Sequence, residues 1–176
     1  MTASKPLVIL KETILAGESK TINMEIAKLH TMNKLKIPII VERSKLDGPT
    51  VLFTACLHGD EINGTEIVRQ LIIQKINKPK RGTIICIPII NIFGFVNQTR
   101  EFPDGRDLNR VFPSSKTGSL ASRFAYYILK DIIPHVDYAI DFHAGGASRF
   151  NAPQIRIVPE NPELKELSDV FNAPFT

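Results

Sequence analysis

Two histidines of this chain follow apolar, strand-like segments, and an acidic residue lies close to each of them. His58 comes shortly after the segment that ends at Cys56, and Glu61 lies three positions further on. His143 stands at the end of another apolar segment, much later in the chain. In the turn after a strand, an imidazole and a carboxylate at this spacing can converge on one point. A distant histidine that reaches the same point completes a set of three metal ligands. Two histidines and one glutamate hold Zn²⁺ with an open position for water, whose pKa the metal lowers toward about 7.

This pattern differs from the helical His-Glu-x-x-His motif, in which the histidines are four positions apart and the glutamate is a base. A lone His-x-x-Glu spacing is common by chance, so the hypothesis depends on the ligands lying at strand ends. The other histidines, His30 and His135, fall in a predicted turn and at a predicted helix end, and we assign them no role. Two aspartates keep alternatives open. For Asp60 the alternatives are a cap of the following helix and a role in the site. For Asp141 they are bonds to local backbone groups and support of His143.

Apolar periodicity predicts the strands that must position these ligands. Alternation with a period of two predicts antiparallel or edge strands at 22–26 and 35–41, and Pro38 fits an edge better than a centre. Nearly continuous apolar runs predict buried parallel strands, at 51–56, 83–88 and 136–142, with 154–158 as a candidate for a fourth.

Helices are predicted between and after these strands. Apolar residues three and four positions apart indicate helices at 67–76 and 120–132, and Asn161-Pro162 is a good start for a last helix. Alternating strands and helices indicate an α/β sheet covered on both faces, with sites beyond the carboxyl ends of its strands. The connection at 91–119 has little periodicity, and connections of this length are usually functional. It carries the polar residues Arg100, Arg106, Asp107, Asn109 and Arg110.

Composition bounds the class of protein. The 176 residues are 43% hydrophobic and 23% charged, which suits one globular domain and argues against disorder, collagen and coiled coil. No apolar run approaches the ~20 residues of a membrane span, and the N-terminus shows no signal-peptide pattern. Cys56 and Cys86 lie in apolar runs, so we expect buried thiols and a cytoplasmic protein rather than a disulfide.

The net charge of +4 is diffuse apart from one basic cluster, at Lys75, Lys78, Lys80 and Arg81. We interpret that cluster as a solvated helix end, where cations are favoured. Because no aromatic residues interleave with it, we expect no nucleic-acid partner.

Four motifs together resemble one family. His58-Gly-Asp-Glu61, Asn91-Ile-Phe-Gly-Phe95, Asp107-Leu-Asn-Arg110 and Asp141-Phe-His143 occur in this order, as in the succinylglutamate desuccinylase/aspartoacylase family of the zinc carboxypeptidase-like group. The resemblance covers roughly residues 35 to 176. It implies an α/β fold, a three-layer sandwich with a mixed, largely parallel central sheet and helices on both faces.

The resemblance also implies roles around one Zn²⁺ per chain. His58, Glu61 and His143 match the family's zinc ligands. Asp107 matches a carboxylate that orients the first histidine ligand, which fixes its tautomer and raises its basicity.

Further residues match positions that bind the substrate. Asn109 and Arg110 match the pair that holds a substrate carboxylate, and an arginine fork suits a carboxylate well. Taken alone, Arg110 fits a surface ion pair better than a substrate-binding role. Arg100 resembles the arginine that polarises the scissile carbonyl and stabilises the oxyanion. Arg106 matches no family role, and we expect it to be solvated.

One part of the family pattern is missing. Amide hydrolysis needs a general base, and in the family this is a glutamate on a strand well downstream of the third ligand. The last acids of this chain lie on or beside the predicted final helix, at Glu160, Glu163, Glu166 and Asp169. We therefore expect the general base to be absent and the chain to be truncated at its C-terminus. We divide it into N-terminal edge strands at 1–45 and an incomplete catalytic part at 46–176, within one domain.

The sequence thus predicts a zinc-dependent deacylase that cleaves the amide bond of an N-acyl amino acid or a similar small carboxylate. Two alternatives stay open, a metallocarboxypeptidase acting on peptides and a non-catalytic metal- and carboxylate-binding fragment. A nucleotide-binding fold is disfavoured because no glycine-rich phosphate loop follows any strand. Self-association is expected if a sheet edge is left exposed.

Overall fold

The computed structural model describes residues 6–28 and 30–176. The chain forms two compact units, one that ends at Gly146 and one from Ala147 to Thr176. Residues 1–5, where the sequence predicts no signal peptide, lie outside the described residues. No helix in the described part of the chain has both the length and the apolar character needed to cross a membrane.

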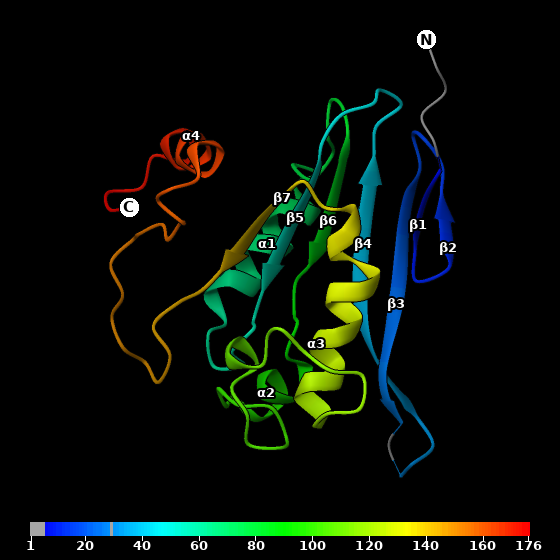
Figure 1. Ribbon diagram of the computed structural model, residues 1–176, viewed down its shortest axis with the longest axis vertical. Helices are drawn as coiled ribbons and strands as arrows, with labels where there is room; N and C mark the ends of the chain where they lie inside the picture. The colour runs from blue at the N-terminus through cyan, green and yellow to red at the C-terminus, as the bar shows by residue number, and fades with distance from the viewer. Residues whose placement is uncertain (1–5, 29) are drawn as a thin grey trace. The chain divides into compact units, whose positions relative to one another are not determined.

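The first unit is built on a mixed five-stranded sheet (Figure 1). Its strands, in spatial order, are β3 (Ser19–Lys28), β4 (Lys34–Arg43), β6 (Thr83–Ile87), β5 (Thr50–Ala55) and β7 (Tyr138–Phe142). β6, β5 and β7 are parallel to one another, whereas β4 pairs antiparallel with both β3 and β6. The predicted mixed sheet, with N-terminal antiparallel strands and a parallel part behind them, is confirmed.

Pro38 lies inside the sheet but in an edge-like setting. β4 pairs with β6 only over Ile40–Arg43, and Pro38 lies opposite Asn23 of β3. This half of β4 therefore has β3 as its one strand neighbour among the described residues. A residue without an N–H is tolerated in such a place because no second ladder depends on it.

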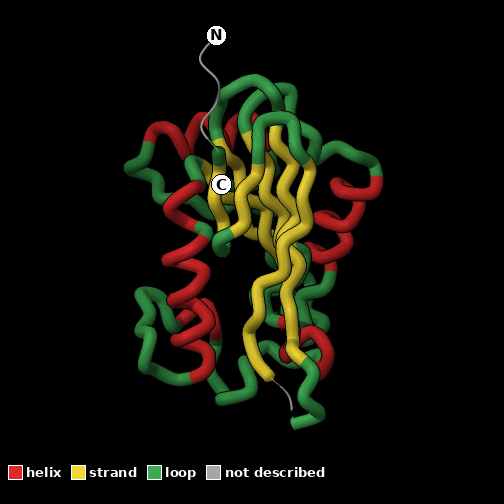
Figure 2. Tube along the Cα trace, turned by 90° about the vertical axis from the view of Figure 1, so that its right-hand side faces the viewer, coloured by secondary structure: helices red, strands yellow, loops and turns green. Residues whose placement is uncertain are grey.

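Helices cover the two faces of the sheet (Figure 2). α3 (Leu120–Asp131) and α1 (Asn63–Ile73) pack on opposite sides, as the alternating side chains of β6 demonstrate. Ile85 and Ile87 belong to the core cluster that includes α3, whereas Cys86 belongs to the cluster that includes α1. Both helices were predicted, and the three layers of the predicted fold are present.

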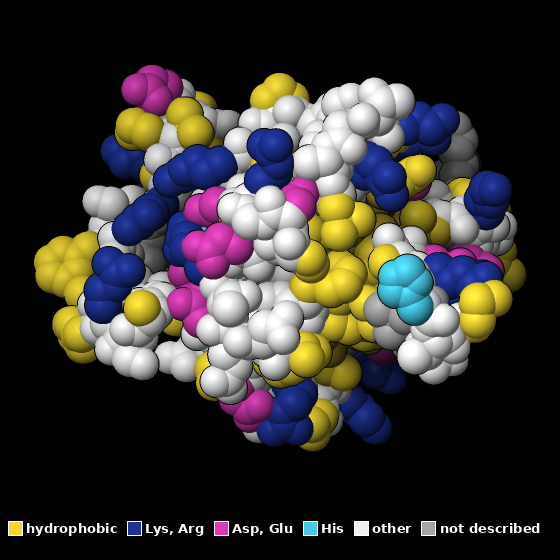
Figure 3. All heavy atoms as spheres, turned by 90° about the horizontal axis from the view of Figure 1, so that it is seen from below, with side chains coloured by type: hydrophobic (Ala, Val, Ile, Leu, Met, Phe, Trp, Pro, Cys, Tyr) yellow, Lys and Arg dark blue, Asp and Glu magenta, His cyan; other side chains and the backbone are white. Residues whose placement is uncertain are grey.

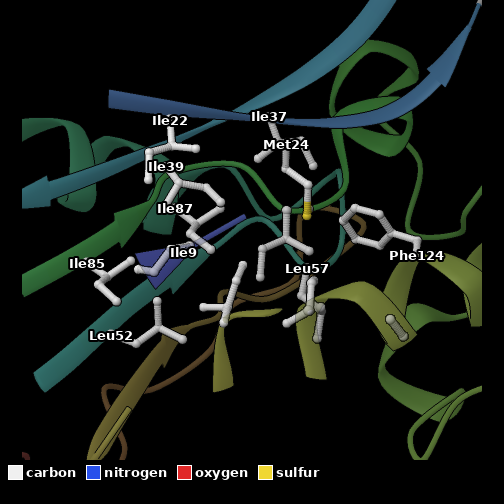
Figure 4. Close-up of a cluster of buried hydrophobic side chains, with 14 of the residues drawn as sticks. Ile9, Ile22, Met24, Ile37, Ile39, Leu52, Leu57, Ile85, Ile87 and Phe124 are labelled. Atoms are coloured by element: carbon white, nitrogen blue, oxygen red, sulfur yellow. The ribbon is translucent and has the colours of Figure 1, made fainter. Parts of the chain in front are cut away.

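The larger core lies on the α3 side. Isoleucines from β3, β4 and β6 meet Phe124 of α3 and Leu57 there (Figure 4). The hairpin of β1 (Leu7–Ile9) and β2 (Glu12–Ile14) adds Ile9 and Ile14 to this core. The sequence did not predict this hairpin, because strands of three residues are too short to display a period.

Both cysteines are free and fully buried, as predicted. Burial raises the pKa of the Cys56 thiol to about 11 and that of Cys86 to about 12. Thiols of this kind are inert.

The connection at 91–119 is more ordered than its composition predicts. It contains α2 (Ile92–Asn97) and the short 3₁₀ helix η1 (Leu108–Arg110), and a second 3₁₀ helix, η2 (Ile133–His135), follows α3. Asn91 caps α2, and Gln98 ends it in the left-handed conformation. A helix of six residues has too few turns for an amphipathic pattern, so only the capping residue marks it in the sequence.

The second unit contains α4 (Pro162–Phe171), which begins where the sequence predicts it. The Asn161 side chain caps this helix by accepting hydrogen bonds from the N–H groups of Glu163 and Leu164. The candidate strand at 154–158 was wrong, since no strand is present there. Apolar residues alternate in this stretch, but no strand among the described residues pairs with it. The Ile155 N–H donates a bond to the Phe175 carbonyl, and the Val158 carbonyl accepts one from the Asn161 N–H, which closes a turn rather than a strand ladder.

Candidate functional site

The parallel pairing of β5 and β7 brings the two predicted histidine ligands together. Thr54 pairs with Asp141 and Ala55 with Phe142, so the two strands end at the same level of the sheet (Figure 1). His58 follows β5 and His143 follows β7, and their ring centroids are 5.0 Å apart. In the view from this end of the strands, acidic and basic side chains lie side by side (Figure 3).

Glu61 lies between the two histidines. Its Oε1 is 2.8 Å from His58 Nδ1, and its Oε2 is 2.9 Å from His143 Nδ1. The Ala144 N–H donates a further bond of 2.9 Å to Oε2. One donor atom from each of the three side chains lies within 4.8 Å of the others. Two imidazole nitrogens and a carboxylate at one point fit Zn²⁺ by number and type of donor.

Each histidine is held from behind by an aspartate. His58 Nε2 is 3.0 Å from Asp107 Oδ1, and His143 Nε2 is 2.9 Å from Asp141 Oδ2. The Thr54 hydroxyl donates a 2.7 Å bond to the other oxygen of Asp141. Such carboxylates keep the proton on the outer nitrogen and leave the inner nitrogen free to accept. We refer to these five side chains, His58, Glu61, His143, Asp107 and Asp141, as the ligand cluster.

Charge and burial act together on the ionisable groups of the cluster. The hydrogen bond to Asp141 is the largest influence on His143 and raises its pKa, against the opposing effect of burial. Burial alone would raise the pKa of Asp107. The bonds it accepts from Arg100, the Asn109 N–H and His58 together lower that pKa instead. Of the two interpretations of Asp141 that the sequence left open, the structure shows the contact with His143.

Arg100 lies at the edge of the ligand cluster. Its Nη2 and Nε are 2.8 Å and 3.1 Å from Asp107 Oδ2, and its Nη1 is 3.4 Å from Glu61 Oε1. The side chain is 39% exposed. The guanidinium therefore joins two carboxylates of the cluster while part of it still faces solvent.

Asn109 and Arg110, which we call the clamp, lie next to Asp107 on η1. The Asp107 side chain caps this short helix by accepting a 2.9 Å bond from the Asn109 N–H. Both clamp residues are exposed. Within residues 6–28 and 30–176, the Arg110 guanidinium has neither a hydrogen bond nor an ion pair. The alternative of a surface ion pair is therefore not observed.

The turn that carries His58 has a demanding backbone. Cys56 is buried and adopts a left-handed φ of 55°, which is uncommon outside glycine. Gly59 lies so close to α2 that a Cβ there would be 1.8 Å from the carbonyl carbon of Gly94. No other residue fits at Gly59 without moving α2 or the turn. Sequence reasoning did not find this contact, although both glycines lie in the motifs it singled out.

The sequence also singled out Arg106 and four acidic residues near the end of the chain, and none of their bonds described here reaches the ligand cluster. Arg106 is exposed and makes a long ion pair of 4.0 Å with Asp104, in agreement with its predicted solvation. The last four acidic residues of the sequence are the ones nearest in the chain to where the family has its general base. All belong to the second unit, Glu160 just before α4 and Glu163, Glu166 and Asp169 on it. The absence of a general base stays a prediction.

Comparison with known proteins agrees with the motifs. Residues 47–174 match the family model described as succinylglutamate desuccinylase/aspartoacylase catalytic domain. A relative from Halomonas elongata, N-alpha-acetyl-L-2,4-diaminobutyric acid deacetylase, is 33% identical over 111 residues, which are 62% of this chain and 32% of the relative.

Solved structures extend the comparison to the fold. An aspartoacylase family protein from Mesorhizobium loti has a TM-score of 0.78 and 29% identity, covering 99% of this chain and 56% of that chain. A structure from Shewanella denitrificans named for carboxypeptidase A has a TM-score of 0.66 at 18% identity, covering 86% of this chain and 43% of that one. This second likeness concerns the fold alone and agrees with the predicted carboxypeptidase-like architecture.

The chain spans about a third of the length of the Halomonas relative and about half that of the Mesorhizobium structure. The family match nevertheless covers most of the chain, including the ligand cluster and the clamp. The chain therefore belongs to the succinylglutamate desuccinylase/aspartoacylase family, as its four motifs predicted.

Proposed function

We propose that this protein is a zinc-dependent deacylase that hydrolyses the amide bond of an N-acyl amino acid or a similar small carboxylate. The observation that carries the proposal is the ligand cluster, in which two histidines face one glutamate and each has an aspartate behind it. The Halomonas relative, whose name describes removal of an acetyl group from an amino acid, supports the same class of reaction.

In this proposal His58 Nδ1, His143 Nδ1 and the Glu61 carboxylate hold the metal. When bound, Zn²⁺ supplies Lewis-acid chemistry and lowers the pKa of a coordinated water toward neutrality. Asp107 and Asp141 accept hydrogen bonds from the outer N–H groups of the two histidines, so that both inner nitrogens offer lone pairs. Glu61 brings negative charge that partly neutralises the dication.

The clamp residues and Arg100 act on the substrate. Arg110 offers a planar fork to the substrate carboxylate, and the Asn109 amide adds a donor. Arg100 is hydrogen-bonded to Glu61 and Asp107 of the cluster. We therefore assign it the role of stabilising the negative charge that develops on the carbonyl oxygen. Asp107 holds both His58 and Arg100, which keeps the ligand and the arginine in one arrangement.

Elemental analysis of protein purified without chelator tests the metal. We expect one zinc per chain in the wild type and loss of that zinc in His58→Ala and His143→Ala. His30→Ala, which removes an exposed histidine from the turn between β3 and β4, is the matched control and should retain its metal. A wild-type content below about 0.2 zinc per chain would sink the proposal, because a site of this kind binds zinc tightly at neutral pH.

A substrate panel tests the reaction class. N-acetyl amino acids should release acetate and a free amine, and peptides should stay intact. Release of C-terminal residues from peptides would instead establish the metallocarboxypeptidase that the sequence left open.

A further inference from the structure

The proposed function leaves the motif Asn91-Ile-Phe-Gly-Phe95 without a role. Asn91 is completely buried, although its side chain is polar. A buried amide must have its hydrogen-bonding groups satisfied, since an unpaired one costs stability. The partners of Asn91 therefore indicate what the residue does.

On one side, Asn91 is bonded to the segment that leads to His58. Its backbone N–H donates a 2.9 Å bond to the Cys56 carbonyl, and the Ile90 N–H donates a 3.0 Å bond to the Ala55 carbonyl. These two bonds tie the segment after β6 to the last residue of β5 and to Cys56, the residue after it. Asn91 is thus tied to the strained residue that immediately precedes the His58 turn.

On the other side, the Asn91 side chain is bonded to the segment that carries Arg100 and Asp107. Its Nδ2 donates to the carbonyls of Arg100 and Glu101, at 3.3 Å each. Its Oδ1 accepts a 2.8 Å bond from the Gly94 N–H and so caps α2. Asn91 therefore joins the end of β5 through its backbone, and it joins the start of α2 to the segment that begins at Arg100 through its side chain.

We propose that Asn91 is a positioning residue that fixes the distance between the His58 turn and the segment from Arg100 to Asp107. This inference rests on the proposed function, since its purpose is to hold Asp107 against His58 and Arg100 against the cluster. The hydrogen bonds of Asn91 described above reach neither the proposed metal ligands nor the clamp, so the residue acts through Asp107 and Arg100.

The residue type follows from the partners. The position needs an acceptor for one N–H and a donor for two carbonyls, and an amide provides both. Aspartate retains the acceptor and is an equally good helix cap, but it places a charged oxygen against two carbonyl oxygens. Serine also caps a helix, but it is too short to supply both functions.

A second anchor makes the expected change local. Phe102 is buried, with its ring centroid 5.2 Å from that of Phe93 and 5.3 Å from that of Phe124. This apolar contact keeps the segment attached to the core when the amide is removed. Loss of the amide should therefore displace Arg100 and Asp107 while the fold is retained.

The experiment compares Asn91→Asp and Asn91→Ser with the wild type by competition for zinc with a chelator. We expect zinc affinity about 10- to 100-fold weaker, the range for loss of a residue that supports a metal ligand. In an Asp107→Ala background the same changes should add less than about twofold, since coupled residues are not additive. Equal effects in both backgrounds would show a general loss of stability and would overturn the proposal.

Asn77→Asp is the matched control. Asn77 is also a buried asparagine, but it follows the far end of α1, and its Nδ2 has no partner among the described residues. The Asn77→Asp change should lower the melting temperature by about as much as Asn91→Asp does, and it should leave zinc affinity unchanged. A similar loss of zinc affinity in Asn77→Asp would assign the effect of Asn91→Asp to the buried charge alone.

A measurement on metal-free protein separates this inference from the proposed function. In the wild type the His58 Nε2 proton should be protected by Asp107 and visible by nitrogen-15 NMR, and it should be absent in Asp107→Ala. We expect Asn91→Asp and Asn91→Ser to weaken or lose it as well. A wild type that shows this proton but binds no zinc refutes the proposed function alone, whereas an unchanged proton in both Asn91 variants refutes the positioning role.

Discussion

The ligand cluster and the clamp meet in the sequence at Asp107, a member of the cluster that both clamp residues follow closely, yet the side chains of the cluster are bonded to one another whereas the clamp is exposed. His58 and Glu61 are 2% and 4% exposed, and their polar groups bond to other members of the cluster or to Arg100. Arg110, three positions after Asp107, is exposed and has no side-chain partner in the described part of the chain. Internal bonds thus fix the arrangement of the cluster, whereas the exposed guanidinium of the clamp is left unbonded among the described residues, as the proposed binding of a substrate carboxylate requires.

The difference agrees with what we propose each group to bind, a metal ion for the cluster and a carboxylate for the clamp. A metal ion demands several donors at set distances, so its ligands are most effective when neighbours hold them in place. A carboxylate is bound by a fork of N–H groups that must not be occupied already. An exposed guanidinium carries no burial cost while it is unpaired.

The strongest way to break the cluster is Glu61→Ala. The change removes the shared partner of both imidazoles and of Arg100, so zinc binding should be lost. The free energy of unfolding of the metal-free protein should fall by about 2 kcal/mol, the cost of leaving the Ala144 N–H and the inner nitrogens of the two histidines without their partner. Urea denaturation of metal-free protein measures this, with Glu66→Ala on the exposed side of α1 as a control that stays near the wild type. A Glu61→Ala protein as stable as the wild type would show that the cluster is not pre-formed.

The two aspartates behind the histidines offer a finer test. Asp107→Ala and Asp141→Ala should each weaken zinc binding by about 10- to 100-fold, and Asp107→Ala should be the more damaging. The reason is that Asp107 also holds Arg100, and the side chain of His58 is far more buried than that of His143, which is 35% exposed. Isothermal titration with zinc compares them. A larger loss in Asp141→Ala would reverse the order of importance inferred from burial.

For the clamp, Arg110→Ala should leave both stability and zinc affinity at wild-type values. Binding of an N-acetyl amino acid should weaken by about tenfold, which corresponds to about 1.4 kcal/mol for a lost charged hydrogen bond. Arg106→Ala, an exposed arginine of the same segment, is the control and should bind the ligand normally. If the Arg110 change lowered zinc affinity, the proposed separation of clamp and cluster would be wrong.

The smallest effect is expected at Asp104, which belongs to neither group. Burial alone would raise its pKa, but bonds from the Ala121 N–H, Ser119 and the Arg106 N–H lower it below the ordinary 3.8. Because the folded-state pKa is depressed, its stabilising effect is present above about pH 4 and is lost as the pH falls through the folded value. Asp104→Asn should thus cost about 0.5 kcal/mol at neutral pH, since the side chain is partly exposed, and nothing in strong acid. A cost that stays constant with pH would contradict this origin.

Much of this arrangement could be predicted because local patterns reported it. The runs at 51–56 and 136–142 became β5 and β7, and parallel pairing placed the residues after them side by side. The hairpin at 7–14 and the helix α2 were missed because they are too short to show periodicity. The candidate strand at 154–158 failed because alternation records only which residues are apolar. A strand also needs a neighbour to pair with.

The sequence by itself determined the chemistry that is available and its order along the chain. The types of His58, Glu61 and His143, and their places after strands, were sufficient to predict a metal site, and the four motifs together were sufficient to predict the family. Only the tertiary structure decided how those side chains are held. His58 meets Asp107 across 49 positions, and His143 meets Glu61 across 82. Hydrogen bonds of this kind depend on distance and direction after folding, which residue type and spacing do not record. For the same reason, only the tertiary structure reveals the bridging position of Asn91.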